Sequence, residues 1–527
     1  MLLCLGGLLG LGLLIWPDYG VSYDVAQSRN IGMTNLHYVL QRLAPSVLQD
    51  PVTINTFMPY TTPLAEFNDR DYGVGYELPV TIGEWMLPFT SLREAYFYRH
   101  LCTFLISYVG ILAVYGLGRR RYGGDWRAGL AAAGLVVLSP RLFGEFFYND
   151  KDAVFMALSA VATYTTVRFV ERPAWGWALA HALACALAID VRLMAVLWPL
   201  ATLLLLAARA KRGEYAAGPA GRWGAFGLYC LALPALVVAL WPYLWEHPWA
   251  NFGQAFSNMA HFRWDGAMWY RGDYVYSKDL PWHYVPQWIL ITTPFLQLAL
   301  LGVGLWAVGR QLVRQRWWFY RAGTREWQDV LFLGLGLGPV LAVVVLHSVL
   351  YDGWRQLYFV YPSLMLLALR GLVATWRWLA TRPQPQQRLV VALGVLGVLS
   401  TAGQMAWMHP LESLYFNRLA GPHGNERYEH DYWGISYRQG IKWVLAHDDR
   451  PVLHIRVDDI MSPAYQQNCE LLTEDERKRL VQVVKPEEAD YFLGNYRWHP
   501  QPYPYPNRVH DIRAGRQVAL SIFRLTW

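Results

Sequence analysis

Long apolar segments recur along the chain and alternate with shorter polar connections. A helix that crosses a membrane needs about 20 mostly apolar residues. Eleven segments meet or approach this length, at residues 1–17, 97–117, 128–147, 153–170, 174–189, 193–208, 223–242, 286–308, 329–350, 355–374 and 388–408. The pattern therefore predicts an α-helical polytopic membrane protein with about 11 transmembrane helices.

Lysine and arginine are distributed unevenly between the two sets of connections. Nineteen of them lie at 117–127, 168–174, 207–222, 309–328 and 370–388, whereas the short connections on the opposite side hold seven. Cytoplasmic connections of membrane proteins carry the excess of basic residues. We therefore expect the first set, and with it the N-terminus, to be cytoplasmic, and the C-terminus to be external. The first span lacks a basic leader and a cleavage site, so it is predicted to be an uncleaved anchor.

Two polar segments are too long to be simple connections. Residues 18–96 form a large external loop with nine acids and four arginines. The tail, 409–527, shows the periodicity of one helix and several strands and predicts a small external α/β domain. The helix-like and strand-like runs lie at 435–447, 452–457, 490–494 and 516–525. We therefore expect a transmembrane domain over 1–408, which includes the loop 18–96, and a separate domain over 409–527.

Composition supports the membrane assignment. Charged residues make up 16% of the chain, against about 25% in soluble domains, and hydrophobic residues make up 54%. These values exclude an ordinary soluble enzyme, a disordered chain and a fibrous protein. The net charge of +7 comes from basic residues in short loops, so no nucleic-acid partner is expected. The five cysteines form no CxxC pair, and neither a disulfide framework nor a zinc site is indicated.

Unusual polar clusters gather at the predicted external ends of the spans. Ionisable residues near a membrane are energetically costly and usually face a cavity or a partner. The clusters therefore predict one shared polar cavity at the outer interface. They are Asp24 with Gln27 and Arg29, Asn149-Asp150-Lys151-Asp152, Asp190 with Arg192, His347 with Tyr351-Asp352-Gly353-Trp354-Arg355, and Tyr428-Glu429-His430-Asp431-Tyr432-Trp433.

The acids of these clusters also have structural explanations. Asp24 can be a solvated loop acid or a helix cap, and Asn149 or Asp150 can cap the fourth span. A cap does not explain Lys151, because a cation is disfavoured at a helix N-terminus. An anion such as a phosphate binds well there, and Lys151 is placed to assist it.

The arginines have structural explanations as well. Asp190 and Arg192 can form an ion pair at a tight turn, and Arg355 can extend from the membrane to its interface. Arginine is, however, also suited to bidentate recognition of phosphate. Lys151, Arg192 and Arg355 together are therefore candidates to bind one phosphate ester at the outer surface.

Five of these motifs together resemble the bacterial branch of the dolichyl-phosphate-mannose–protein mannosyltransferase-like glycosyltransferases, the GT-C class. The resemblance covers nearly the whole chain. It rests on Tyr23-Asp24, Ser139-Pro140-Arg141 to Phe147-Tyr148-Asn149-Asp150-Lys151-Asp152, Tyr351-Asp352-Gly353-Trp354-Arg355, His409-Pro410 to Tyr415-Phe416-Asn417, and Glu429-His430-Asp431-Tyr432-Trp433-Gly434.

The resemblance implies a GT-C-like fold and an enzyme that transfers a sugar from a polyprenyl-phosphate carrier to an acceptor on the external face. It implies a catalytic acid in the first external loop, where Asp24 matches, although the family's frequent Asp-Glu pair is Asp24-Val25 here. We expect Asp24 to be the general base on the acceptor hydroxyl. Asp150 and Asp152 are alternative candidates for this catalytic role. Direct displacement with one carboxylate predicts inversion at the anomeric carbon.

The other candidates are expected to bind substrates. They are Lys151, Arg192 and Arg355 for the donor phosphate, and Asn149, Asp190 and Glu77 for the acceptor or the sugar. The expected partners are the polyprenyl-phosphate sugar donor, a glycan, lipid or protein acceptor, and the bilayer of the plasma (inner) membrane. No cofactor is expected, and no metal is assigned, because nothing fixes the spacing of metal ligands.

Two other functions remain open at this point. A transporter or flippase of lipid-linked sugars would have a similar external site, but such proteins often show repeated halves and broken helices, which the sequence lacks. A non-catalytic subunit of an envelope-polymer machine would tolerate the loss of Asp24 and Lys151.

Overall fold

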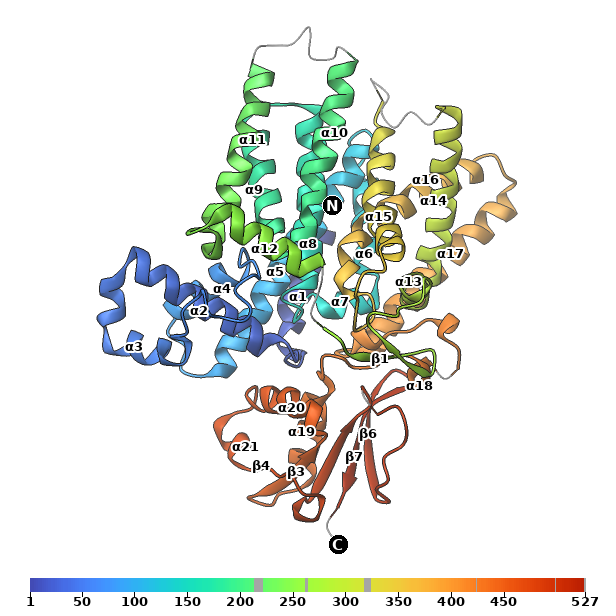
Figure 1. Cartoon of the computed structure of the whole chain (residues 1–527). Coiled ribbons are helices and arrows are strands. Elements are labelled where there is room, and N and C mark those ends of the chain that lie inside the picture. The colour runs from blue at the N-terminus through green and yellow to red at the C-terminus, as the bar shows by residue number, and fades with distance from the viewer. Residues whose placement is uncertain (213–220, 261–263, 317–323, 423, 498, 526–527) are drawn as a thin grey trace.

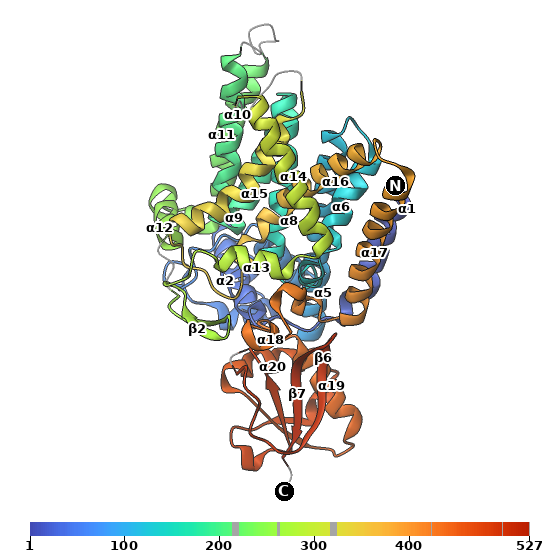
Figure 2. The same ribbon diagram turned by 90° about the vertical axis from the view of Figure 1, so that its right-hand side faces the viewer.

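The computed structural model describes residues 1–212, 221–260, 264–316, 324–422, 424–497 and 499–525. A bundle of long helices forms one end of the elongated molecule, and a compact α/β unit with the C-terminus forms the other (Figure 1). A view turned by 90° shows the same arrangement, with the sheet beyond one end of the bundle (Figure 2). The polar clusters predicted from the sequence lie where these two parts meet.

Eleven apolar helices of the described residues coincide with the predicted spans. Eight are long and apolar enough to cross a membrane, counting the turns that lead into α10 and α16: α5 (Leu92–Arg121), α8 (Asp152–Glu171), α10 (Leu197–Lys211), α11 (Gly221–Leu240), α14 (Phe295–Arg314), α15 (Trp327–Val345), α16 (Tyr361–Leu379) and α17 (Gln384–Met408). The three shorter ones are α1 (Leu2–Ile15), α6 (Trp126–Val137) and α9 (Trp175–Val191). The predicted fold class is confirmed, and the number of helices that cross the membrane stays a prediction.

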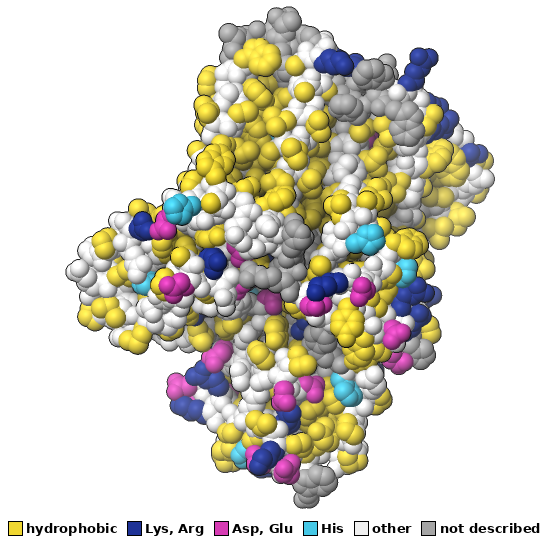
Figure 3. All heavy atoms as spheres, viewed as in Figure 1, with side chains coloured by type: hydrophobic (Ala, Val, Ile, Leu, Met, Phe, Trp, Pro, Cys, Tyr) yellow, Lys and Arg dark blue, Asp and Glu magenta, His cyan; other side chains and the backbone are white. Residues whose placement is uncertain are grey.

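The surface of the bundle is suited to lipid. Figure 3 shows hydrophobic side chains dominating the surface of the long helices. On α17, Leu393, Leu396 and Leu399 expose 57–63% of their surface. A helix pairs its own backbone groups internally and can therefore present such side chains to hydrocarbon. The chain is a multi-pass membrane protein.

Proline interrupts two of the predicted spans. Residues 128–147 are divided into α6 and α7 (Pro140–Glu145), and residues 286–308 into α13 (Tyr284–Thr292) and α14. Pro140 is the first residue of α7, and Pro294 directly precedes α14. Proline lacks the N–H that a continuing helix needs but is tolerated at a helix start. Two of the predicted spans are therefore each divided in the structure.

The loop 18–96, predicted to be external, is largely helical, which the sequence analysis did not predict. It contains α2 (Val25–Leu43), α3 (Pro51–Phe57) and α4 (Glu77–Met86), which lie beside the bundle in Figure 1. Arg99 of α5 fixes them: its Nη1 and Nε atoms lie 2.8 Å from carboxylate oxygens of Glu77 and Glu84. Arg29 of α2 adds an Nε contact of 2.6 Å to Glu84. These ion pairs hold α2 and α4 against α5.

The tail folds around a five-stranded mixed sheet. Its strands have the order β4-β3-β5-β7-β6, with β3 parallel to β4 and β5, and β7 antiparallel to β5 and β6. The α19 helix packs against β5 and β7. The elements are β3 (Leu453–Val457), β4 (Leu480–Gln482), β5 (Tyr491–Asn495), β6 (Arg508–Ala514), β7 (Gln517–Arg524), α18 (Gly424–Arg427), α19 (Ser436–His447), α20 (Ser462–Cys469) and α21 (Glu474–Lys478).

The predicted α/β character of the tail is confirmed, since α19, β3, β5 and β7 match the four expected runs. The sequence analysis missed β4, which is only three residues long, β6, and the external hairpin of β1 (Ala267–Tyr270) and β2 (Asp273–Tyr276). The hairpin contacts the start of the tail, where the Glu429 N–H donates to the Trp269 carbonyl at 3.0 Å. The division of the chain into 1–408 and 409–527 stays a prediction.

Candidate active site

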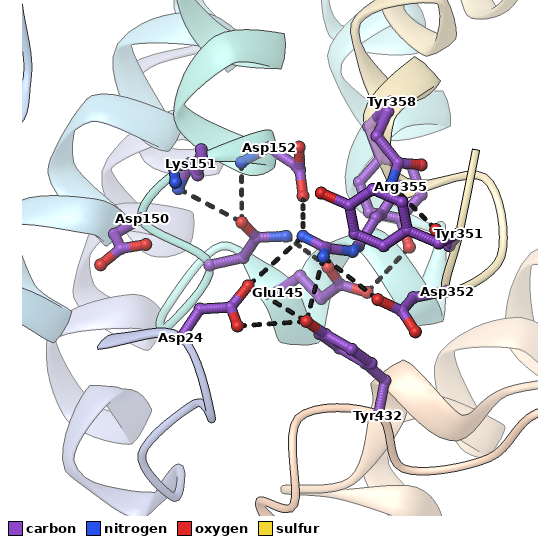
Figure 4. A network of polar contacts seen from close by, with 12 residues as sticks. Asp24, Glu145, Asp150, Lys151, Asp152, Tyr351, Asp352, Arg355, Tyr358 and Tyr432 are labelled. Atoms are coloured by element: carbon purple, nitrogen blue, oxygen red, sulfur yellow. Dashed lines mark hydrogen bonds and ion pairs between the residues drawn. The ribbon is translucent and has the colours of Figure 1, made fainter. Parts of the chain in front are cut away.

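Polar side chains from distant parts of the chain meet around Arg355. This residue begins the 3₁₀ turn Arg355–Val360 that leads into α16, and it is 4% exposed. Its Nη1 lies 3.0 Å from Asp152 Oδ2 and 3.5 Å from Asp24 Oδ2, and its Nη2 lies 3.2 Å from Asp352 Oδ2 (Figure 4). One guanidinium thus connects three carboxylates from three different segments.

Asp24 is the most exposed of these three carboxylates. Its side chain keeps 30% of its surface exposed, against 1–2% for Asp152 and Asp352. The hydroxyl of Tyr432 donates to both oxygens of Asp24, at 3.1 and 3.2 Å. Asp24 precedes α2, yet no N–H of that fully described helix donates to its side chain. Its orientation therefore comes from Arg355 and Tyr432 and not from helix capping.

The turn before α8 explains Asn149 and places Lys151 near an aromatic ring. Asn149 Oδ1 accepts hydrogen bonds from the N–H groups of Asp152 at 2.7 Å and Lys151 at 3.3 Å. This is the geometry of a helix cap, so the structural explanation fits Asn149, and its role in substrate binding stays a prediction. The Nζ atom of Lys151 lies 4.3 Å from the ring centroid of Tyr72.

The expected ion pair between Asp190 and Arg192 is wrong. The Nη2 atom of Arg192 instead contacts Asp152. Arg192 has the extended φ and ψ of −150° and 124° where α9 ends, so its side chain points away from that of Asp190. Asp190 is fully buried against Gly73, where a Cβ would fall 1.7 Å from the Asp190 carbonyl oxygen. No described residue hydrogen-bonds the Asp190 carboxyl, and its role in substrate binding stays a prediction.

Glu77 and Asp150 extend the site towards α4 and α5. Glu77 is paired with Arg99, as described above, and its predicted role in binding is untested. Asp150 is 6% exposed and accepts a hydrogen bond from Ser28 Oγ at 3.2 Å. Burial and the charge of Glu77 raise the pKa of Asp150 to about 8. Its carboxyl is therefore mostly protonated at neutral pH and is poorly suited to accept a proton.

A cavity of about 550 Å³ opens beside the charged cluster. This volume is typical of a small-molecule site. The lining combines the loop before α4, the end of α9 and α12 (Pro248–Ala260); it includes Tyr72, Ile189, Val191, Arg192, Leu193, Met194, Trp241, Met259 and Tyr351. Arg192 connects the two features, because it lines the cavity and contacts Asp152 in the cluster.

A second cavity, of about 30 Å³, lies on the side of the tail. Glu145, Asp352, Arg355, Glu429 and Tyr432 are among the residues that line it. It has room for about one water molecule and is too small for a sugar. Substrates are therefore expected on the side of Arg192. Among the described residues, no group of three or more His, Cys, Asp or Glu side chains is arranged to hold a metal.

The sequence analysis missed the roles of three residues in this network. Glu145 accepts hydrogen bonds from the Tyr358 hydroxyl at 2.8 Å and from Asn149 Nδ2 at 2.6 Å. Tyr432 lay in a motif without an assigned role, and Arg497 Nη2 lies 3.2 Å from Asp352 Oδ1. Arg497 follows β5, and the carboxyl ends of parallel strands often carry functional groups. That position was the one signal that could have identified it.

Residues 89–247 match the sequence profile of a family described as dolichyl-phosphate-mannose-protein mannosyltransferase. This segment is similar to that family. It extends from the residues before α5 to the end of α11 and includes Asn149, Lys151, Asp152 and Arg192 of the site. The predicted resemblance is confirmed over this segment, which lacks Asp24 and Arg355. No curated protein matches the chain in sequence.

Several solved structures resemble the chain. ArnT from Cupriavidus metallidurans in the apo state is 12% identical, with a TM-score of 0.47 over 98% of this chain and 97% of that chain. The same enzyme bound to undecaprenyl phosphate is 13% identical, with a TM-score of 0.46 and the same coverage. The arabinofuranosyltransferase AftD from Mycobacteria matches 82% of this chain and 35% of its own at 13% identity, with a TM-score of 0.35. Likenesses this low assign no role to any residue of this chain.

Proposed function

We propose that the chain is a membrane glycosyltransferase that moves a sugar from a polyprenyl-phosphate carrier to an acceptor hydroxyl on the external face. The observation that carries this proposal is the exposed carboxylate of Asp24, which contacts Arg355 in the same charged cluster as Arg192. Arg192 in turn lines a cavity that combines apolar side chains with this arginine and with Asp69 and Asp71. The description of the family that residues 89–247 match names a dolichyl-phosphate-mannose donor. That donor, like the one proposed here, is a sugar carried on a lipid phosphate.

The cavity of about 550 Å³ fits the two ends of such a donor. Its apolar residues, such as Val191 and Trp241, suit the isoprenoid next to the phosphate. Arg192 supplies a guanidinium for the phosphate oxygens, and Lys151 supplies a second cation near the start of α8. Arg355 is buried behind them among carboxylates and supports the site by holding Asp24 and Asp152.

The chemistry follows from this arrangement. Asp24 takes the proton of the acceptor hydroxyl while the hydroxyl oxygen bonds to the anomeric carbon. The bond from that carbon to the phosphate oxygen breaks, and Arg192 and Lys151 stabilise the charge on the departing polyprenyl phosphate. One displacement inverts the anomeric centre. Asp152, which contacts two arginines, orients them and remains ionised; Asp150, as a neutral acid, is left as a hydrogen-bond donor to the sugar.

The same proposal includes the orientation of the chain in the plasma (inner) membrane. The excess of basic residues in one set of connections supports a cytoplasmic N-terminus. The tail over 409–527 is then external, on the same side as Asp24. A flippase does not require an exposed base beside its lipid site, and the family that residues 89–247 match is described as a transferase. The transferase is therefore favoured over the flippase.

The test uses the purified protein in nanodiscs with a panel of polyprenyl-phosphate sugars and acceptors, and it measures release of polyprenyl phosphate. The wild type is expected to consume one donor, and Asp24→Asn to lose about 100- to 10,000-fold in rate, as removal of a general base predicts. Glu66→Gln, which removes an exposed acid from the same loop, is the matched control and keeps wild-type activity. Consumption of no donor, together with movement of lipid-linked sugar across a vesicle, would reject the transferase.

A further inference from the structure

Tyr432 reaches the site from the tail, far in sequence from the other groups. Its hydroxyl donates to both carboxylate oxygens of Asp24, at 3.1 and 3.2 Å, and accepts from Arg355 Nη2 at 3.0 Å. Figure 4 shows it pointing between these two side chains. Tyr432 does not belong to the lining of the larger cavity. It therefore touches the expected base and not the expected donor site.

The ring of Tyr432 is held between two guanidinium groups. The Cζ atom of Arg497 lies 3.9 Å from the ring centroid, and that of Arg355 lies 4.6 Å from it. Asp352 joins both arginines, since its two oxygens each lie 3.2 Å from one of them. Asp352 has a φ of +56°, which residues other than glycine adopt rarely and only where their surroundings hold them. Contacts on both sides thus fix the ring.

The segment that carries Tyr432 is also fixed to the tail sheet. The Asp431 carboxylate accepts hydrogen bonds from the N–H groups of Ile435 and Ser436, each at 3.2 Å. It also accepts one from Asn495 Nδ2 at 2.8 Å, and Asn495 is the last residue of β5. Arg497, two residues later, follows the same strand. The sheet therefore sets the position of the phenol and of the arginine that packs on it.

We propose that Tyr432 is a positioning residue for Asp24 and that the tail completes the active site by supplying it. The inference rests on the proposed function, because it assigns Tyr432 a role through the base. Its hydroxyl bonds both oxygens of Asp24 and thereby fixes the rotamer of that carboxylate.

The phenol of Tyr432 acts as a donor under assay conditions. Burial raises the pKa of Tyr432, so the hydroxyl stays protonated and keeps its hydrogen bonds to Asp24.

The experiment compares Tyr432→Phe with wild type and with Tyr465→Phe, which removes the hydroxyl of a buried tyrosine of α20 outside the site. For Tyr432→Phe, kcat should fall about 10- to 100-fold, as expected for a hydrogen bond to a charged group. The donor KM should stay within about twofold of wild type, since Tyr432 does not line the larger cavity. Tyr465→Phe should keep the wild-type kcat and donor KM.

Each other outcome has a distinct meaning. A wild-type kcat in Tyr432→Phe overturns the inference. So does a loss of kcat that comes with an equally large change in donor KM, or that Tyr465→Phe shows as well, because a merely structural role gives either result. A wild type that consumes no donor rejects the proposed function instead, and the inference falls with it. An active wild type whose Asp24→Asn variant is equally active rejects Asp24 as the base and, with it, its positioning by Tyr432.

Discussion

Two clusters of arginines and acids lie at the outer ends of the helices, and they differ in how completely they are closed. In the cluster of Arg99, both acidic partners and the arginine expose only 2–9% of their side chains. In the cluster of Arg355, Asp24 exposes 30% and Arg192 exposes 18%, and Arg192 lines a cavity of about 550 Å³. In the first cluster only Arg29, which pairs with Glu84 and exposes 20% of its side chain, reaches the surface, and both carboxylates are closed off. The second cluster exposes a carboxylate and adjoins a cavity.

The difference indicates what each cluster does. Removing charges from water costs free energy. A buried ion pair holds its geometry because the loss of either partner leaves an uncompensated buried charge, which is strongly destabilising. The Arg99 cluster connects α2 and α4 to α5 in this way and has no adjoining cavity among those described. The Arg355 cluster uses the same chemistry to hold one carboxylate that a substrate can still reach. Exposure of a carboxylate, and not the number of charges, distinguishes the cluster proposed to be functional from the structural one.

Breaking the closed cluster should have the largest effect on stability. Arg99→Met leaves Glu77 buried without its partner and Glu84 with Arg29 alone. It should lower the free energy of unfolding by about 3–5 kcal/mol. Turnover per folded molecule should stay within about twofold of wild type. Unfolding in detergent measures the first quantity. Lys278→Met, which breaks an exposed ion pair, is the control and should change stability by less than about 1 kcal/mol.

Removing the arginine that joins the Arg355 cluster to its cavity should weaken donor binding and leave folding unchanged. Arg192→Met removes the guanidinium that lines the cavity and should weaken binding of the polyprenyl-phosphate donor by about 10- to 100-fold. Arg192→Lys keeps the charge but not the planar fork and should lie between this variant and wild type. Donor titration in nanodiscs gives the affinities. Unchanged donor affinity in Arg192→Met would place the phosphate elsewhere.

The smallest expected effect concerns Asp150. Besides burial, the charges of Glu77, from the Arg99 cluster, and of Asp24, from the Arg355 cluster, both raise the pKa of its carboxyl. Its pKa is about 8 in the folded protein, against an ordinary value of 3.8. The folded state therefore binds the proton more tightly, and stability is lost as the pH rises from 3.8 through 8. Asp150→Asn removes this dependence. Its melting temperature should fall less between pH 5 and pH 8 than that of wild type, and parallel pH dependences would refute the raised pKa.

The sequence predicted the helices of the bundle because a long apolar run has few alternatives to a membrane helix. It predicted the gathering of Asp24, Asp152 and Arg355 only as a set of polar clusters on one side. The contacts within that set depend on long-range packing: Arg497 and Asp352 are 145 residues apart and bridge the tail and the bundle. No local pattern encodes such a pair.

Local geometry caused the other errors. Asp190 and Arg192 are close in sequence, but α9 ends between them, and their side chains diverge. The helices α3 and α4 are short, and α2, although 19 residues long, carries mixed polar and apolar residues. All three therefore lack the long apolar run that identified the spans. The breaks at Pro140 and Pro294 do not follow from proline alone, because α11 and α15 continue through Pro234 and Pro339.

The central claim is that the exposed carboxylate of Asp24 takes the proton of the acceptor hydroxyl during sugar transfer. The most direct test is the single-turnover rate of Asp24→Asn at saturating acceptor, measured together with its donor affinity. The account predicts a rate lower by about 100- to 10,000-fold, with donor affinity within about twofold of wild type. A wild-type single-turnover rate in this variant would contradict the account.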